Sequence, residues 1–382
     1  MKAVEALSAW TVRCMAAGQT TWAGRSWLAF LRLASHVYGG LVSLRTAFFA
    51  RGLTGIRRLP VPVLSVGNLI AGGTGKTPFV EMLARRLHTR GHRVAVILRG
   101  YRGRSTAPVI ISDGRQVLVE PPVAADEAYL LARHLPGVAV LTGADRYRVG
   151  QLALEQLKCE IIVLDDGFQH LRLHRDLDIV LLDAANPMGY GRLLPSGLLR
   201  ERPDGLARAD LLVVTHADSG ADVDEIKRSL RRYAPTAPIA LAVHRPLGLT
   251  GACGEERLSP SHLDGQRLVA FSGIGNPRGF EATLVRLGAV ILAHHVFPDH
   301  YAYSAADLEA LSAATMKVRA ACMVTTEKDM VKLARLNLEK MVTPLYALAI
   351  SLDIVEGEET LDRMLSGLQG AIASEDERSE SA

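Results

Sequence analysis

The most constraining feature of this sequence is a glycine-rich segment, SVGNLIAGGTGKTP, at residues 65–78. It follows a short apolar run that predicts a β-strand and precedes PFVEMLARRLHTRG, which predicts a helix. In that context glycines let backbone N–H groups approach phosphate oxygens, and the helix N-terminus adds positive potential. The segment therefore predicts a phosphate-binding loop and an α/β fold.

The loop supplies the first candidate site residues. Lys76 can reach the β- and γ-phosphates of a nucleotide, and the Thr77 hydroxyl can ligate Mg²⁺. The usual pattern places a glycine six residues before the lysine, where this chain has Ile70. The nucleotide-binding candidates are therefore the shifted run Gly72, Gly73, Thr74, Gly75, Lys76 and Thr77.

Downstream of Pro60, short Val- and Ile-rich runs alternate with helix-length segments, which is typical of βαβ units and a mostly parallel sheet. We expect strands at 61–66, 93–98, 137–142, 160–165, 177–182, 209–214, 267–272, 290–295, 321–326 and 344–349. The predicted organisation is an N-terminal helical segment (1–60), a P-loop NTPase-like core domain whose sheet is flanked by helices (61–250), a smaller C-terminal α/β domain (251–370) and a disordered acidic tail (371–382).

Charge is distributed unevenly along the chain. The net charge is +4, yet residues 1–60 alone carry eight Lys or Arg and one acid. A uniformly basic nucleic-acid binder would not show this distribution, and the asymmetry instead favours an N-terminal segment that meets an anionic surface. No apolar run reaches the roughly 20 residues that span a bilayer. The four cysteines lie far apart, which fits a reducing cytoplasm without disulfides.

Residues 26–49 predict an amphipathic helix. At 100° per residue its apolar arc comprises Trp27, Phe30, Leu31, Ala34, Val37, Tyr38, Leu41, Leu44 and Phe48. Arg45 interrupts this arc, and Gly39-Gly40 should weaken the helix. Two interpretations remain open: a helix that packs on the protein's own core, or one that lies in a membrane interface.

Two acids end the strand expected at 160–165. In P-loop folds a carboxylate at the carboxyl end of a buried strand lies on the Mg²⁺ side of the nucleotide, so Asp165 and Asp166 are candidate metal ligands. The alternative is a structural turn, because Asp166-Gly167 is good turn chemistry.

A kinase also needs a base for the acceptor hydroxyl, and two segments could supply one. Asp126-Glu127 precedes a helical stretch, so the pair could serve only as favourable N-terminal acids. The other segment is Phe297-Pro298-Asp299-His300-Tyr301, whose histidine could equally be structural. Spacing alone does not show that these segments meet.

Eight blocks together resemble one family, the tetraacyldisaccharide 4′-kinases, which are the lipid A 4′-kinases of Gram-negative bacteria. The blocks are SVGNLIAGGTGKTP (65–78), RGYRG (99–103), DEAYLLA (126–132), DDGFQHLRLHRDLDIVLLD (165–183), LLPSGLLRE (193–201), FSGIGNPRGF (271–280), FPDHYAYS (297–304) and TTEKDMVKL (325–333). The chain departs from the family at Leu98, where a serine is frequent, and around the acids, where Ala125 and Ala128 replace glycine and proline.

The resemblance implies transfer of phosphate from MgATP to the 4′-hydroxyl of tetraacylated glucosamine disaccharide 1-phosphate, for lipid A and lipopolysaccharide biosynthesis. It implies two α/β domains and a peripheral position on the cytoplasmic face of the inner membrane, with no nucleic acid and no obligate protein partner. Asp126 matches the family's catalytic base, His300 its paired histidine and Lys76 its phosphate-loop lysine. The further active-site positions are Glu127, Gln169, Arg200 and Glu201.

Some questions stay open at this stage. A P-loop ATPase or GTPase acting on a protein partner, such as a metallochaperone, is an alternative, although the signature lysine of that subclass is replaced by Ala71. A catalytically silent nucleotide-binding scaffold is another. Arginines near residues 99–104, or Arg146 and Arg148, could meet the lipid's own phosphate. The TTEKD segment has no assigned role.

Overall fold

The structure, a computed structural model, describes residues 10–12, 14–15, 21–100, 107–252, 257–299, 301–336, 338, 341 and 343–368, and every statement below concerns these residues. Contacts within the chain group it into two compact units. The first unit is Met1–Val243 with Asp353–Ala382, and the second is His244–Leu352. Strands β8 (Ile239–Gly251) and β13 (Leu345–Glu356) each begin in one unit and end in the other.

The first unit is built on a parallel sheet in the order β8-β7-β6-β1-β5-β2-β4-β3, in which only β3 runs antiparallel to its neighbour. The strands are β1 (Val63–Asn68), β2 (Val94–Leu98), β3 (Val109–Asp113), β4 (Ala139–Thr142), β5 (Ile161–Asp165), β6 (Leu177–Asp183) and β7 (Leu211–Thr215). Strand β1 lies between β5 and β6, with Val66 paired to Asp165. The end of the phosphate-loop strand and the acidic strand end therefore share one edge of the sheet.

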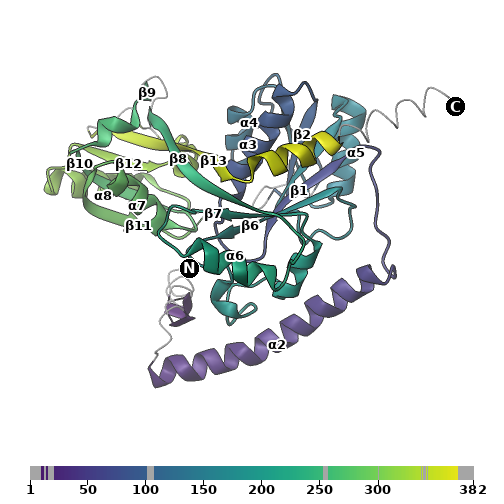
Figure 1. The fold of residues 1–382 in the computed structure, drawn as a ribbon. Coiled ribbons are helices and arrows are strands. Elements are labelled where there is room, and N and C mark those ends of the chain that lie inside the picture. The colour runs from purple at the N-terminus through teal and green to yellow at the C-terminus, as the bar shows by residue number, and fades with distance from the viewer. Residues whose placement is uncertain are drawn as a thin grey trace. The chain divides into compact units, whose positions relative to one another are not determined.

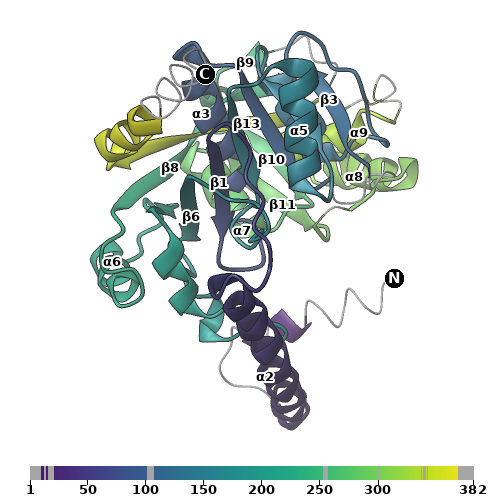
Figure 2. The same cartoon turned by 90° about the vertical axis from the view of Figure 1, so that its right-hand side faces the viewer.

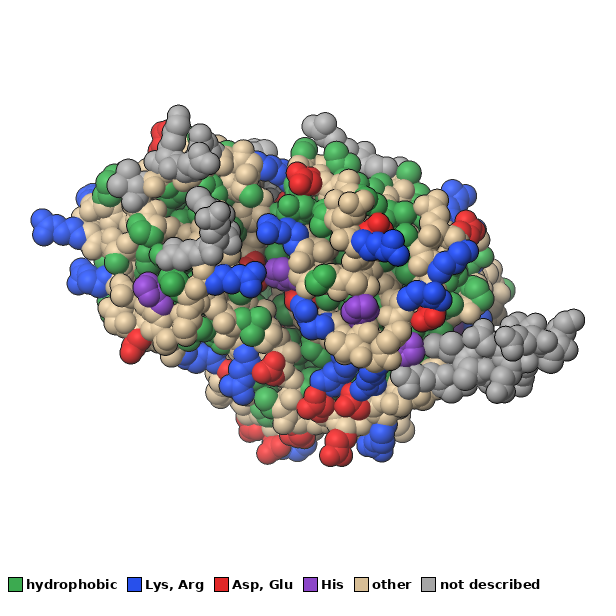
Figure 3. Space-filling view, turned by 90° about the horizontal axis from the view of Figure 1, so that it is seen from above, with side chains coloured by type: hydrophobic (Ala, Val, Ile, Leu, Met, Phe, Trp, Pro, Cys, Tyr) green, Lys and Arg blue, Asp and Glu red, His purple; other side chains and the backbone are tan. Residues whose placement is uncertain are grey.

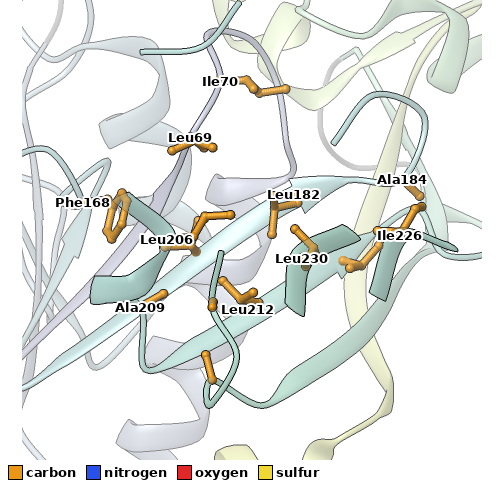
Figure 4. Packing of buried hydrophobic residues seen from close by; sticks show 14 of the residues in the cluster. Leu69, Ile70, Phe168, Leu182, Ala184, Leu206, Ala209, Leu212, Ile226 and Leu230 are labelled. Carbon is orange, nitrogen blue, oxygen red and sulfur yellow. The ribbon is translucent and has the colours of Figure 1, made fainter. Parts of the chain in front are cut away.

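Helices cover both faces of this sheet. They are α3 (Lys76–Thr89), α4 (Asp126–His134), α5 (Arg146–Leu157) and α6 (Val223–Arg231), with short 3₁₀ helices η1 (Gly189–Gly191) and η2 (Pro203–Arg208). Figure 2 shows α3 and α5 on opposite sides of β1. Because side chains alternate along a strand, Ile162 and Leu164 of β5 both join the cluster beneath α5. A second cluster, drawn in Figure 4, packs the start of the phosphate loop against Phe168 and Leu206.

The second unit contains a smaller parallel sheet. Its strands β10 (Arg267–Ser272), β11 (Val290–Val296) and β12 (Cys322–Thr326) pair in the order β11-β10-β12, followed by the first half of β13. Helices α7 (Pro277–Arg286), α8 (Ala305–Lys317) and α9 (Glu327–Leu333) connect them, and η3 (Pro260–Leu263) and β9 (Arg257–Leu258) precede them. Each strand is followed by a helix, so the carboxyl ends of β10, β11 and β12 lie at one edge.

The N-terminal helix α2 (Trp22–Ala50) lies against the 193–200 segment through the small residues Ser35 and Gly39, while its buried leucines cluster with Cys14. Its buried positions are Gly24, Leu28, Leu31, Ser35 and Gly39. The Ser35 hydroxyl donates to the Ser196 hydroxyl at 2.8 Å, and the Tyr38 hydroxyl donates to the carbonyl of Arg200 at 2.7 Å. A Cβ on Gly39 would lie 2.6 Å from Leu193 Cδ1. The glycine that weakens the helix therefore permits its close approach to the 193–200 segment.

The opposite side of α2 exposes large apolar side chains. This apolar stripe of α2 consists of Phe30, Leu33, Val37, Leu41, Leu44 and Phe48. At 100° per residue all six fall within one narrow arc. The predicted helix is present, and its predicted apolar arc is split: Leu31 is buried in a cluster with Cys14 and Leu28, whereas Phe30, Val37 and Leu41 are exposed. Among the described helices, none is long and apolar enough to cross a membrane.

The α/β fold with a mostly parallel sheet and an N-terminal helix is confirmed, and each strand expected from an apolar run is present (Figure 1). Sequence reasoning missed β3, β8 and β9, whose patterns are short or partly polar. The observed division differs from the predicted domains. The second unit begins at His244, and residues 353–368, including a helix at 358–368, group with the first unit because ion pairs tie them to α3.

Two smaller expectations concern surface charge and cysteines. On the face drawn in Figure 3, basic and acidic side chains are interspersed and do not merge into one basic patch. Among the described residues, Cys14, Cys159 and Cys322 are buried free thiols. Cys253 and the acidic tail at 371–382 lie outside the described residues.

Candidate active site

The phosphate loop leaves β1 at Asn68 and enters α3 at Lys76. Its backbone takes positive φ values at Gly72 (124°) and Gly75 (77°), conformations that side chains with a Cβ disfavour. Gly75 is the N-cap of α3 and offers no side chain to the helix. The first backbone N–H groups of α3 are therefore left to a ligand, which is the arrangement that binds phosphate.

Four hydrogen bonds hold the loop in shape. The Asn68 amide donates to Thr74 Oγ1 at 3.1 Å, and Thr215 Oγ1 at the end of β7 donates to the Thr74 carbonyl at 3.1 Å. On the other side, the Ala71 N–H donates to the Leu198 carbonyl at 2.7 Å and the Arg200 N–H donates to the Leu69 carbonyl at 2.9 Å. These bonds tie the loop to the end of β7 and to the 198–200 segment.

Ile70 explains the departure from the usual glycine pattern. Its side chain is 6% exposed and belongs to the cluster drawn in Figure 4. It also forms a bridge with Leu199. A glycine at this position would supply no side chain to the cluster. The isoleucine packs the start of the loop against the core, and the glycines with positive φ lie closer to Lys76.

The acidic strand end contains two carboxylates in different surroundings. Asp165 is 6% exposed, and its Oδ1 has no hydrogen-bond partner among the described residues. Burial, reinforced by the negative charge of Glu127, raises the pKa of Asp165 to about 7. Asp166 adopts a left-handed backbone (φ 55°) and accepts from Arg200 Nη1 at 2.7 and 2.9 Å. Burial opposes its ionisation, but Lys76 and Arg200 together lower the pKa of Asp166.

Lys76 points toward these acids. Its Nζ lies 3.6 Å from Asp166 Oδ1, and its side chain is 14% exposed. Burial lowers the pKa of Lys76, although Asp166 acts in the opposite direction and Arg200 adds to the lowering. The positive charge of Lys76 is buried and only partly balanced by Asp166. A further negative charge nearby, such as a nucleotide phosphate, would therefore stabilise it.

Three more predicted residues join the same network. The Gln169 amide donates to the Asn68 carbonyl at 2.9 Å and to Glu201 Oε1 at 3.0 Å. Glu201 is 5% exposed and also accepts from Arg208 Nη2 at 2.7 Å. Gln169 and Glu201 therefore connect the acidic strand end to the segment that braces the phosphate loop.

The acceptor-side residues are placed in part. Asp126 and Glu127 form the first turn of α4, and the charge of Glu127 acts on both Asp165 and Lys76. Thr77 is the second residue of α3. His300 lies outside the described residues, so its pairing with Asp126 stays a prediction. Within the described ranges no group of three or more His, Cys, Asp or Glu could hold a metal by itself.

Sequence reasoning missed Asn68 and Thr215, both fully buried polar residues at strand ends. A polar residue closing an apolar strand was the available signal for each. From the sequence, Arg146 was only one of several arginines that could meet the lipid's phosphate. The structure instead buries Arg146 (2% exposed), where it donates to the carbonyls of Gly143 at 2.9 Å and Asp165 at 3.3 Å. Arg148 is exposed, and residues 101–106 lie outside the described ranges.

A fixed glycine loop, Lys-Thr at a helix start and an acidic strand end on one edge of a parallel sheet define a P-loop nucleotide-binding protein. Known proteins narrow this class. A family model described as tetraacyldisaccharide-1-P 4′-kinase matches residues 27–369. The chain belongs to this family of kinases, which confirms the resemblance seen in its sequence blocks.

Individual relatives agree with this assignment. The tetraacyldisaccharide 4′-kinase of Syntrophus aciditrophicus is 42% identical over 333 residues, covering 85% of this chain and 88% of the relative. The protein of that name from Geobacter sulfurreducens is 43% identical over 348 residues, covering 88% and 93%. The crystal structure of the "apo" form of LpxK from Aquifex aeolicus in complex with ATP superposes with a TM-score of 0.71 at 33% identity, covering 90% of this chain and 99% of that one.

Proposed function

We propose that this chain transfers the γ-phosphate of ATP to the 4′-hydroxyl of tetraacyldisaccharide 1-phosphate, a step of lipid A biosynthesis. The observation that carries the proposal is the family match over residues 27–369 together with the intact cluster of Lys76, Asp165 and Asp166 at the sheet edge. A silent scaffold would have no reason to keep a buried, partly compensated lysine beside two carboxylates.

The nucleotide would be held by the phosphate loop. Backbone N–H groups from Gly72 to Thr77 would bind its phosphates, because the two positive-φ glycines and the uncapped start of α3 leave those groups available. Lys76 would neutralise charge on the transferred group, and its lowered pKa shows that burial makes this charge costly without a partner.

A magnesium ion fits the acidic strand end. Asp165 has an oxygen without a hydrogen-bond partner among the described residues and a pKa raised to about 7, which a nearby dication would reverse. Both oxygens of Asp166 already accept from Arg200. Asp165 is therefore the better first ligand, with Thr77 beside the phosphates and Asp166 as an outer partner. When bound, Mg²⁺ would neutralise phosphate charge.

Asp126 is the proposed base. It would accept the proton of the sugar hydroxyl while that oxygen attacks the γ-phosphorus and the bond to the departing ADP breaks. Its position in the first turn of α4, beside a residue whose charge reaches Lys76, supports this role. His300 would tune or orient the carboxylate, as the family resemblance implies.

The apolar stripe of α2 would dock on the cytoplasmic face of the inner membrane. Phe30, Leu41 and Phe48 are 61%, 63% and 41% exposed, which is unusual for such residues in a row on one helix. The helix is already held to the protein through Ser35 and Tyr38, so its open face is free to enter the headgroup region. The excess of Lys and Arg in residues 1–60 would favour anionic lipid.

The direct test is phosphate transfer. Purified protein is incubated with γ-labelled ATP, Mg²⁺, detergent and tetraacyldisaccharide 1-phosphate, with Lys76→Ala and Asp126→Ala in parallel. Label should enter the lipid, and both variants should lose about 10²-fold or more of the rate. ATP consumption without labelled lipid would reject this substrate and favour a partner-driven ATPase. Wild-type transfer by Asp126→Ala would remove the base assignment.

A further inference from the structure

Helix α2 contacts the backbone of two active-site residues in the first unit. The Tyr38 hydroxyl donates to the carbonyl of Arg200 at 2.7 Å, and Arg45 Nη2 donates to the carbonyl of Gln169 at 2.9 Å. Residues 38 and 45 are seven positions apart, so an α-helix places both on the same face. The Gln169 contact also accounts for the arginine that interrupts the apolar arc expected from the sequence.

Arg200 is held at its backbone and at its side chain. Its N–H donates to the Leu69 carbonyl at 2.9 Å, and its own carbonyl accepts from Tyr38. Its Nη1 donates to both oxygens of Asp166, at 2.7 and 2.9 Å. Burial opposes the ionisation of Asp166, whereas Lys76 and Arg200 lower its pKa. The backbone position of Arg200 therefore decides how its guanidinium meets the acidic strand end.

The surroundings of Tyr38 suit a hydrogen-bond donor. Burial raises the pKa of the Tyr38 hydroxyl, although the charge of Arg200 opposes this, so the hydroxyl keeps its proton at neutral pH. One turn earlier on α2, the Ser35 hydroxyl donates to Ser196 Oγ at 2.8 Å. Gly39 lets the helix approach the Leu193 side chain. These small residues bring the helix close enough for Tyr38 to reach the Arg200 carbonyl.

Gln169 connects the Arg45 contact to the phosphate loop. The Gln169 amide donates to the carbonyl of Asn68 and to Glu201 Oε1, and the Asn68 amide donates to Thr74 Oγ1 within the loop. The guanidinium of Arg45 also lies 5.7 Å from the ring centroid of Phe49, one turn further along α2. The Arg45 bond is exposed whereas the Tyr38 bond is partly buried, so the Tyr38 bond should matter more.

We propose that Tyr38 and Arg45 are positioning residues, through which α2 sets Arg200 and Gln169 for phosphate transfer. The inference rests on the proposed function, in which Asp166 and the phosphate loop hold MgATP. Neither Tyr38 nor Arg45 need touch a substrate. Each holds a backbone carbonyl, and small misplacements of the groups around a reacting centre are costly to rate.

Matched substitutions test the two contacts. Tyr38→Phe removes only the hydroxyl, and Tyr233→Phe does the same to a ring that packs against the cluster of Figure 4. Arg45→Gln removes a charge from α2, and Arg32→Gln removes the same charge from an exposed position of that helix. With detergent-dispersed lipid, kcat should fall about tenfold for Tyr38→Phe and about threefold for Arg45→Gln, with KM for the lipid unchanged. Both controls should match wild type.

Double-mutant cycles then separate positioning from a merely structural role. If Tyr38 acts through the Arg200 guanidinium, Tyr38→Phe should lower kcat in the wild-type background and have no further effect beside Arg200→Ala. Arg45→Gln should likewise have no further effect beside Gln169→Ala, which gives a second test if Arg200→Ala does not fold.

Independent, multiplying losses in these cycles would overturn the positioning role while leaving the kinase assignment intact. Wild-type kcat in both Tyr38→Phe and Arg45→Gln would overturn it as well. Failure of the wild-type protein itself to label the lipid would instead reject the proposed function.

Discussion

The two units carry charged residues at the same place in their architecture, the carboxyl edge of a parallel sheet, and use them differently. In the first unit Lys76 and Asp166 are 3.6 Å apart and 14% and 19% exposed, and Asp165 keeps an oxygen with no hydrogen-bond partner among the described residues. In the second unit Asp329 and Lys332 are 2.7 Å apart, almost fully buried, and bonded to Gly273.

The difference shows how to distinguish a binding edge from a structural one. At the first edge the charges are incompletely paired within the protein, and burial raises the pKa of Asp165 to about 7 and lowers the pKa of Lys76. At the second edge, Asp329 and Lys332 pair with each other and with the backbone of Gly273. Motif recognition alone treats GGTGKT and TTEKD alike, whereas their hydrogen-bond partners separate them.

The largest expected effect on stability comes from comparing the same substitution, lysine to methionine, at the two sheet edges. Lys332→Met leaves Asp329 as a buried charge without its partner and should lower the free energy of unfolding by about 3–5 kcal/mol. Lys76→Met removes a charge whose pKa is already lowered by burial, so it should cost far less. Urea unfolding of the wild type and both variants measures the difference.

The matched control is the double variant Asp329→Asn with Lys332→Met, which removes both charges and should recover part of the loss. Equal destabilisation by Lys76→Met and Lys332→Met would contradict the distinction between the two edges.

Helix α2 shows a similar contrast, because one of its faces is buried within the protein and the other exposes apolar side chains. Leu41→Asp places a charge on the open apolar stripe and should weaken binding to anionic vesicles by about 10–100-fold, since a buried leucine contributes about 1.5–3 kcal/mol. Ser43→Asp adds the same charge at an exposed position outside the stripe. Vesicle co-sedimentation should show a much smaller loss for Ser43→Asp; equal losses would mean that charge alone decides binding.

His170, near the first edge, sharpens the comparison through pH. Burial, with Arg146 and Arg175, lowers the pKa of His170 to about 4. The folded state then binds fewer protons than the unfolded state, whose histidine titrates near 6.5, so stability falls as pH drops from about 6.5 to 4. Between pH 7.5 and 4.5, the free energy of unfolding should fall by roughly 1–2 kcal/mol less in His170→Gln than in wild type. This figure is reduced because His170 is partly exposed to solvent. Identical pH profiles would count against this burial.

The smallest effect comes from the adjacent glycines of α2. A Cβ on Gly40 meets nothing within 4 Å, so Gly40→Ala should stabilise the protein by about 0.5–1 kcal/mol through helix propensity. Gly39→Ala must displace Leu193 and should give no such gain. Thermal unfolding that ranks Gly39→Ala above Gly40→Ala would argue against the observed packing face.

Local pattern sufficed for much of this molecule. The phosphate loop, the acidic strand end and the apolar strands were predictable because each depends on a pattern of consecutive residues. The face by which α2 packs was not, because periodicity locates an apolar arc without saying that small residues such as Ser35 and Gly39 make the contact.

The contacts between the 198–200 segment and the site could not be predicted from the sequence either. Arg200 reaches Asp166, and Leu198 reaches Ala71, across long stretches of chain that only the fold brings together. For Arg146 the sequence offered only a possible contact with the lipid's phosphate, whereas the structure buries this arginine, which donates to the carbonyl of Asp165. The pairing of Asp126 with His300 remains a prediction.

The most direct measurement is equilibrium binding of ATP to wild type, Lys76→Met and Lys328→Ala under identical conditions. The division between the two edges predicts that Lys76→Met weakens ATP binding by about tenfold or more, while Lys328→Ala, which removes the TTEKD lysine that lies 3.1 Å from Asp299 Oδ1, binds ATP as wild type does. Unchanged ATP affinity in Lys76→Met, or an equal loss in Lys328→Ala, would contradict it.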